Sequence, residues 1–193
     1  MKESVRCNKG EYWHTFTREH NHEWFESKKI IIPMTAKDVT AAYEADHGFY
    51  MDNSNVWFIN LDSGDDMVFK ALTMIFNSTV FSVLAKSGAI ALRGGYYKFN
   101  KQYLNPAPLP NEKLVPGNRK IRELADYYEE LTGLQEKYEK AEQHNRIYFK
   151  SVMEHKWEEV DRICNEFYGL DVNDWTEIEK VGRVVDRVTG KEG

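Results

Sequence analysis

Five lysine and arginine side chains occur between residues 67 and 111 without a single acid. They are Lys70, Lys86, Arg93, Lys98 and Lys101. A local positive patch is what phosphate binding requires, whatever the net charge of the chain. Burial in a core also excludes acids, and the apolar run over residues 67–92 is typical of a core. That explanation does not extend to residues 93–101, RGGYYKFNK, so the phosphate-binding chemistry is centred on this shorter stretch.

The net charge of −5 is unevenly distributed along the 193 residues. Residues 1–110 carry twelve basic and twelve acidic side chains, whereas residues 111–193 carry fourteen and nineteen. The acidity therefore belongs to the second part and disfavours a nucleic-acid contact along its length. The 41% hydrophobic content is typical of a protein with a packed core. No apolar run approaches the roughly 18 residues of a membrane span, and the two cysteines lie far apart, so we expect a cytoplasmic protein without a membrane partner.

Motifs for catalysis are absent or incomplete. The sequence has no glycine-rich nucleotide loop, and residues 105–108, NPAP, lack the aromatic residue that stacks a flipped base. Glu26 and Lys28 form a partial nuclease pattern, which would need a further acid to hold Mg²⁺. Histidines near the N-terminus lack the additional ligands of a zinc site. We therefore expect no catalysis in this chain, with a nuclease centred on Glu26 as an alternative to be tested.

The elements that must position the basic stretch indicate a mixed α and β first part. Residues 28–34, KKIIIPM, predict a buried strand, and residues 48–53 and 55–61 predict two further strands joined as a hairpin. Apolar residues at helical spacing predict a helix over residues 66–86. These elements would form a small mixed or antiparallel sheet with a packed helix.

The segment that follows carries the basic stretch itself. Residues 96–99, YYKF, predict a strand in which one of Tyr96 and Tyr97 faces inward. The prolines at 106, 108 and 110 predict an extended exit over the surface. The first domain is therefore expected to span residues 1–110.

Residues 111–193 predict a helical arm. A helix is expected to begin near Asn118, and its apolar residues recur every three or four positions, as in a helical seam. Either a second helix starts near Leu134 or one helix bends at Gly133. Gly169 is expected to end the helical hairpin, and Asp174 to begin a last short helix. The predicted fold class is α+β, with a C-terminal, coiled-coil-like helical hairpin.

Several short motifs, taken in order, resemble the TaqI-like C-terminal specificity domain. This is the target recognition domain of N6-adenine DNA methyltransferases and of type IIG restriction-modification enzymes. The resemblance covers about residues 11–171 and includes Phe76-Asn77-Ser78, with phenylalanine in place of the usual leucine. The other matching segments are Trp13 to Arg18, KIIIP at 29–33, GFY at 48–50, the glycine pair at 94–95, YLNPAPLP at 103–110 and WEEVDRICNEFYGLD at 157–171.

The resemblance implies a module that reads double-stranded DNA beside a methyltransferase domain or subunit. S-adenosylmethionine, and any Mg²⁺, would then bind only to other parts of the parent enzyme, so no cofactor is expected in this chain. The chain would be a fragment of that enzyme or a stand-alone subunit. The residues expected to contact DNA are Arg93, Gly94, Gly95, Tyr96, Tyr97, Lys98 and Lys101, with Arg18, His20 and His22 as a second set. Asn77 and Ser78 are expected to make structural hydrogen bonds.

An alternative function places the activity in the arm. In this second hypothesis residues 118–168 form a protein-interaction or homo-oligomerisation module, and the α+β part is only structural. A simpler role for the arm is an antiparallel hairpin that caps the first domain.

Overall fold

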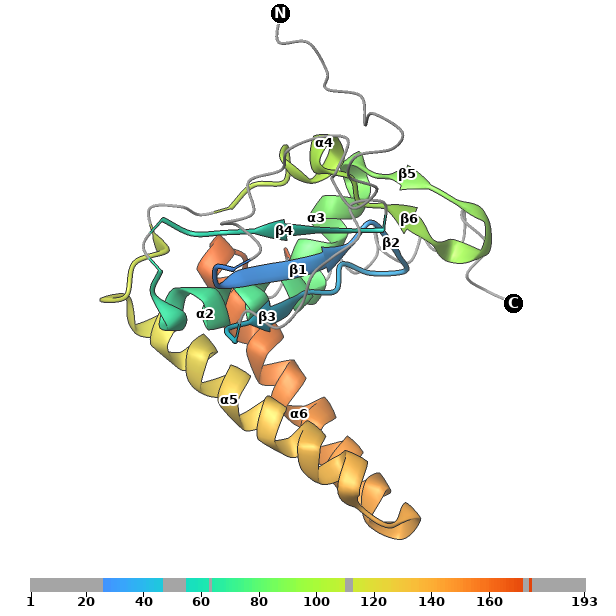
Figure 1. Ribbon diagram of the computed structural model, residues 1–193, viewed down its shortest axis with the longest axis vertical. Coiled ribbons are helices and arrows are strands. Elements are labelled where there is room, and N and C mark those ends of the chain that lie inside the picture. Colours follow the sequence, from blue (N-terminus) through green and yellow to red (C-terminus); the bar gives the residue numbers. More distant parts are fainter. Residues whose placement is uncertain (1–25, 47–54, 63, 110–112, 172–173, 175–193) are drawn as a thin grey trace, which may run out of the picture.

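The computed structural model describes residues 26–46, 55–62, 64–109, 113–171 and 174. Two small antiparallel sheets pack with helices into a base, and a long helical hairpin extends from it (Figure 1). The predicted α+β fold class is confirmed. The strand and hairpin predicted around residues 48–53 lie outside the described residues, as does the short helix expected after Asp174.

The first sheet is built around β1 (Lys29–Pro33), which lies between β3 (Ala42–Glu44) and β4 (Val56–Ile59). Both pairings are antiparallel, with Ile30 opposite Tyr43 on one side and Ile59 on the other. Ile30 and Ile32 are fully buried, as a run of β-branched residues in a central strand requires. The strands predicted over residues 28–34 and 55–61 are therefore confirmed.

Two helices occupy the region where the sequence predicted one. α2 (Asp66–Asn77) begins at Asp65, whose carboxylate accepts a hydrogen bond from the Met67 N–H at 2.9 Å. α3 (Thr79–Gly88) follows at an angle of 67°. The change of direction occurs at Ser78, which has an extended backbone conformation. The prediction of one continuous helix over residues 66–86 was therefore wrong at this single residue.

Asn77 and Ser78 fix the bend with structural hydrogen bonds. The Ser78 hydroxyl donates to the Ile75 carbonyl at 2.6 Å and accepts from the Phe81 N–H at 3.3 Å, so it caps α3. The Asn77 amide accepts from the Ala41 N–H and donates to the Ala41 carbonyl, both at 2.8 Å. The pair thus ties the bend to the segment before β3, and its predicted structural role is confirmed.

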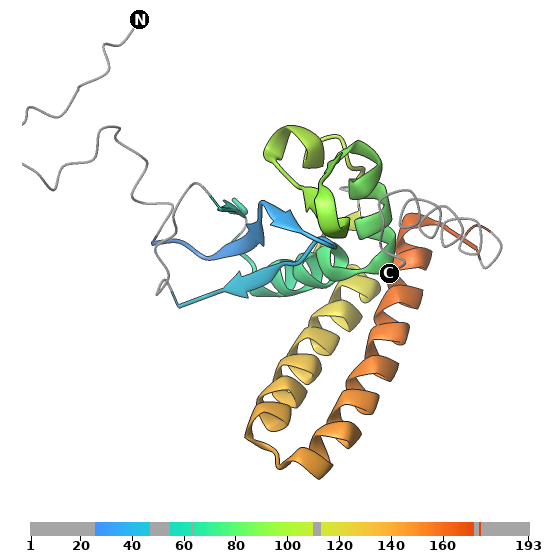
Figure 2. The ribbon, with the colours of Figure 1, turned by 90° about the vertical axis from the view of Figure 1, so that its right-hand side faces the viewer.

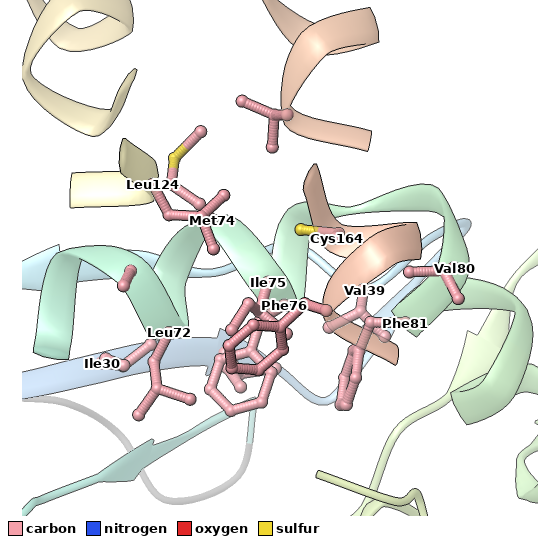
Figure 3. Close-up of a cluster of buried hydrophobic side chains, with 14 of the residues drawn as sticks. Ile30, Val39, Leu72, Met74, Ile75, Phe76, Val80, Phe81, Leu124 and Cys164 are labelled. Atoms are coloured by element: carbon pink, nitrogen blue, oxygen red, sulfur yellow. The ribbon is translucent and has the colours of Figure 1, made fainter. Parts of the chain in front are cut away.

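α2 and α3 form the centre of the hydrophobic core. Figure 3 shows side chains of both helices together with Ile30 and Val39 from the sheet side and Leu124 and Cys164 from the arm. All of these labelled side chains are at most 5% exposed. Burial of each large aliphatic or aromatic side chain stabilises the fold by about 1.5–3 kcal/mol. The core is thus continuous between the sheet-bearing base and the first turns of the arm.

No single helix in the described part of the chain is long and apolar enough to cross a membrane. α2 and α3 together meet the length and composition of a membrane span, but they form a bent pair and most of their side chains are buried in the core.

The second sheet has the order β2 (Thr35–Ala36), β6 (Tyr97–Lys98), β5 (Ile90–Ala91). β5 and β6 are joined through the short 3-10 turn η1 (Arg93–Gly95), and β6 leads into α4 (Lys101–Leu104). Phe99, which follows β6, is hydrogen-bonded to Met34 between β1 and β2 and to Trp57 of β4. The Phe99 N–H donates to the Met34 carbonyl at 2.8 Å, and the Trp57 indole donates to the Phe99 carbonyl at 3.0 Å.

The arm consists of α5 (Arg119–Lys140) and α6 (Gln143–Tyr168), which run side by side in opposite directions (Figure 2). Asn118 caps α5 and Gly169, at φ 76°, ends α6, so both predicted boundaries are confirmed. Gly133 lies inside α5, and the chain turns at Ala141 and Glu142 instead. The prediction of a helix start at Leu134 or a bend at Gly133 was therefore wrong.

The base of the arm is anchored to the first part of the chain. In α6, the Asp161 carboxylate accepts hydrogen bonds from the Thr79 N–H at 2.8 Å and from the Thr79 hydroxyl at 2.6 Å. Burial raises the pKa of the Asp161 carboxyl, against the two Thr79 hydrogen bonds, which lower it. Asp161 thereby satisfies a free N–H group at the start of α3.

Candidate nucleic-acid interface

The hairpin formed by β5, η1 and β6 carries most of the basic stretch. Along it, Tyr96 and Lys98 are exposed, whereas Tyr97 and Phe99 are at most 1% exposed. This is the alternation that a strand imposes on successive side chains. The prediction that one of Tyr96 and Tyr97 faces inward is confirmed. Tyr97 is that residue, and its inclusion among the DNA contacts was wrong because its side chain belongs to the core.

The glycine pair shapes the turn of this hairpin. Gly94 and Gly95 have φ angles of 77° and 74°, in a backbone region that residues other than glycine rarely adopt. The turn is closed by the Leu92 N–H, which donates to the Tyr96 carbonyl at 2.7 Å. A Cβ atom on Gly94 would lie 3.6 Å from the Tyr96 ring. Gly95 is buried, so its predicted role in close backbone approach to a duplex is replaced by a role in the turn.

Strand register defines one outward face on the second sheet. Lys98 lies opposite Thr35 on one side and Ile90 on the other. Two residues further along the hairpin, the turn hydrogen bond places Tyr96 beside Leu92. The Lys37 ammonium lies over the Tyr96 ring. We call this surface the hairpin face. Its residues are Thr35, Lys37, Ile90, Leu92, Tyr96 and Lys98, all of them exposed.

Residues 67–111, which contain no acid, are called the acid-free window. Two of its five cations are neutralised by acids from distant parts of the chain. Lys70 pairs with Glu129 of α5, and Lys86 pairs with Asp38 at 2.5 Å. The Lys86 ammonium also lies 5.3 Å from the centre of the buried Tyr97 ring. The positive charge that the sequence assigns to this window is therefore reduced at its N-terminal end, and the remainder is concentrated on the hairpin and α4.

The other three cations of the window, Arg93, Lys98 and Lys101, are exposed and form no ion pair with any described acid. Arg93 is the first residue of η1, next to the hairpin face. Lys101 begins α4, three residues beyond Lys98. There it borders a mostly apolar cleft of about 610 Å³ between β4 and residues 104–109, so only Arg93 and Lys98 lie directly at the hairpin.

Lys37 is a member of the surface that sequence reasoning missed. Its ammonium lies 5.7 Å from the centre of the exposed Tyr96 ring, at cation–π distance. It follows β2, which pairs with β6 across some sixty residues of sequence. Pairing between two-residue strands leaves no periodic signal, so only the three-dimensional register brings Lys37 to Tyr96.

The predicted second set of DNA contacts, Arg18, His20 and His22, lies outside the described residues. Among the residues that the structure describes, no three histidine, cysteine or acidic side chains are grouped to hold a metal ion. Burial raises the pKa of the Cys164 thiol to about 12, which leaves it a poor nucleophile at neutral pH.

Comparison with protein families gives a match that contains the hairpin face. Residues 8–109 match the family described as the TaqI-like C-terminal specificity domain. The matched segment includes both sheets, α2, α3 and α4, and it ends before the arm. No curated protein matches the chain significantly. Because the match covers more than half of the chain, the protein belongs to the TaqI-like C-terminal specificity domain family, the DNA-recognition modules of restriction-modification enzymes.

Proposed function

We propose that this chain reads the sequence of double-stranded DNA for an adenine-specific methyltransferase or restriction-modification enzyme and has no catalysis of its own. The observation that carries the proposal is the hairpin face inside the family match, where Lys37 and Lys98, which have no described acid partner, share one face with the exposed Tyr96. Such a surface attracts a polyanion because its positive charge is not neutralised within the protein.

The residues proposed to contact DNA divide by chemistry. Arg93, at the turn, is suited to guanine, whose O6 and N7 can accept two parallel hydrogen bonds. Lys37, Lys98 and Lys101 are suited to phosphate, which fixes the position of a protein on the duplex. Tyr96 presents a 44% exposed ring between these charges. Gly94 and Gly95 act by holding the turn, and Arg18, His20 and His22 remain predicted contacts.

The remainder of the parent enzyme would supply the chemistry. The proposed partner is a methyltransferase domain or subunit that binds S-adenosylmethionine and flips the target adenine out of the duplex. The nuclease alternative centred on Glu26 would need a further acid beside Glu26 to hold Mg²⁺, and Mg²⁺-dependent cleavage of DNA by the full chain would support it.

Binding of the full chain to fluorescent duplexes of random sequence, at low salt, tests the proposal. We expect saturable binding that weakens steeply as salt is added, because phosphate neutralisation releases counterions. A chain that binds no duplex at low salt would contradict the function. In the complete parent enzyme, Arg93→Ala with Lys98→Ala should reduce methylation of the target, and unchanged methylation would remove these residues from the interface.

A second candidate function is protein interaction through the tip of the arm. Ile147 and Tyr148, near the start of α6, are 75% and 65% exposed. Large apolar side chains at such a position are typical of contact surfaces. Light scattering of the chain and of an Ile147→Asp, Tyr148→Asp variant tests this role. A dimer that the substitutions dissociate would support it, and a concentration-independent monomer would oppose oligomerisation through residues 118–168.

A further inference from the structure

Exposed apolar side chains gather on the hairpin face. Six large hydrophobic side chains are exposed among the described residues, and three of them lie here: Ile90 at 45%, Leu92 at 38% and Tyr96 at 44%. The others are Val115 in the linker before α5 and the two residues at the arm tip. Phosphate binding alone does not require apolar groups, so their presence among cations calls for a second kind of contact.

The register places one of these apolar residues beside a cation and joins the other two to each other. Ile90 lies directly opposite Lys98, and Leu92 lies opposite Tyr96. Adjacent strands are about 4.8 Å apart, so the outer strands β2 and β5 of this short three-stranded ribbon lie about 10 Å apart, within the width of a major groove of about 12 Å. Within such a ribbon, Lys98 and Arg93 can reach phosphates and base edges while Ile90 and Leu92 face the groove.

The major groove of B-form DNA presents one apolar group, the C5-methyl of thymine. The cations around the patch have no described acid partner, which favours an anionic ligand over a protein surface. A duplex is the ligand that offers both an anionic backbone and an apolar methyl group within the same groove.

We propose that Ile90 and Leu92 contact the 5-methyl groups of thymines in the major groove, so that the recognition sequence contains thymine where β5 lies. This inference rests on the proposed DNA-binding function. It assigns to β5 a specificity role, whereas the lysines supply contacts that do not depend on sequence.

The test replaces the methyl group without changing any hydrogen bond. Duplexes with a randomised centre are enriched for binding to the full chain, and an enriched duplex is then resynthesised with single deoxyuridines in place of thymidines. At a contacted position, the wild-type chain should lose about fourfold in affinity for each methyl removed. The Ile90→Ala, Leu92→Ala variant should bind both duplexes equally.

Two further variants keep the test decisive. Ile90→Gln keeps a side chain of similar length at this exposed strand position but removes its apolar end, so it should lose the methyl dependence at the thymine that Ile90 contacts while remaining folded by circular dichroism. Val115→Ala removes an equally exposed apolar side chain away from the face and should retain the full dependence.

The outcomes separate this inference from the function on which it rests. If enriched duplexes contain no fixed thymine, or if uridine weakens wild type and variant equally, the thymine contact is refuted while DNA binding stands. Unchanged DNA binding by the Ile90 and Leu92 variants, combined with lost binding to a separate methyltransferase part, would refute it in favour of a protein contact. Failure of the wild-type chain to bind any duplex at low salt would refute both proposals.

Discussion

The hairpin face and the arm both carry exposed cations, but among the described residues most of those of the arm are paired with acids and those of the hairpin face are not. In the arm, Lys120 pairs with Glu166 at 2.7 Å, and Lys156 pairs with Glu130 at 2.5 Å across the two helices. These contacts lower the pKa of the Glu166 carboxyl and raise that of the Lys156 ammonium. No described acid pairs with Lys98 on the hairpin face.

The difference indicates what each set of charges does. Exposed ion pairs contribute little to stability, about 0–1 kcal/mol each, but they match the two helices of the arm to one another. Cations without an internal partner keep their full field for an external anion. The arm charges are therefore interpreted as structural and the hairpin charges as functional. In Figure 1, β5 and β6 lie at the opposite end of the molecule from the tip of the arm.

The largest effect is expected from removing charge in the two regions in parallel. Arg93→Ala with Lys98→Ala should weaken duplex binding by about tenfold or more at moderate salt, because two counterion-releasing contacts are lost. Arg119→Ala with Lys150→Ala removes the same residue types from exposed i,i+4 pairs of the arm. Fluorescence anisotropy should show nearly wild-type affinity for this arm variant. Equal losses in the two variants would show that only net charge matters.

Two glycines provide the next comparison, with opposite expected signs. Gly94→Ala places a side chain at φ 77° near the Tyr96 ring and should destabilise the fold by about 1 kcal/mol. Gly133 lies in the interior of α5 with nothing within 4 Å of an added Cβ, so Gly133→Ala should stabilise by about 0.5–1 kcal/mol. Urea unfolding measures both. Stabilisation by Gly94→Ala would contradict the described turn.

Lys37 sharpens the boundary of the hairpin face. Lys37→Ala should reduce the slope of log affinity against log salt by about 0.9, the value for one phosphate contact. Lys140, 80% exposed and 3.8 Å from Glu136 in the arm, gives the matched control. Lys140→Ala should leave the slope unchanged. An unchanged slope for Lys37→Ala would confine the interface to the hairpin itself.

The smallest effects are expected from two carboxyls whose pKa values move in opposite directions. Hydrogen bonds from Lys28 and then Tyr43 lower the pKa of Asp66, so its stabilising contribution is present above its unfolded value of 3.8. That contribution is lost as pH falls through the folded pKa. The free energy of unfolding of Asp66→Asn should therefore differ less from that of the wild type as pH falls below 3.8.

The Asp161 carboxyl in the arm has the opposite sign. Burial raises its pKa above 3.8, so the stability associated with its protonated form is lost as pH rises through the folded pKa. The free energy of unfolding of Asp161→Asn should thus rise relative to that of the wild type as pH rises from 3.8. Urea midpoints between pH 3 and 6 measure both trends, and parallel trends in the two variants would contradict this assignment.

The sequence predicted features that depend on local chemistry. The β-branched run of β1, the cap at Asn118 and the left-handed Gly169 are each specified by neighbouring residues. The alternation of Tyr96 and Tyr97 follows from strand geometry, although sequence alone did not decide which of the two is buried. The short motifs identified the specificity domain because they occur along this chain in the same order as in the family.

Features that depend on distant contacts could not be predicted. The bend at Ser78 arises where a serine cap competes with an otherwise continuous apolar helix, and Asn77 stabilises it through Ala41. Gly133 stays helical because it lies within a 22-residue helix that packs against α6, and this packing outweighs the low helix propensity of one glycine. The charge of the acid-free window was overestimated, because Glu129 and Asp38 reach Lys70 and Lys86 from elsewhere in the chain.

The most direct test of the central claim is the salt dependence of duplex binding by the full chain. Four exposed cations without an acid partner among the described residues, Lys37, Arg93, Lys98 and Lys101, predict a slope of log affinity against log salt of about −3 to −4. Anisotropy titrations between 50 and 200 mM salt, roughly the range over which such contacts weaken, would measure it. A slope of about that size, reduced by roughly two in the Arg93→Ala, Lys98→Ala variant, is the predicted result. A slope near zero, or one that this variant leaves unchanged, would contradict the assignment of the hairpin face to DNA.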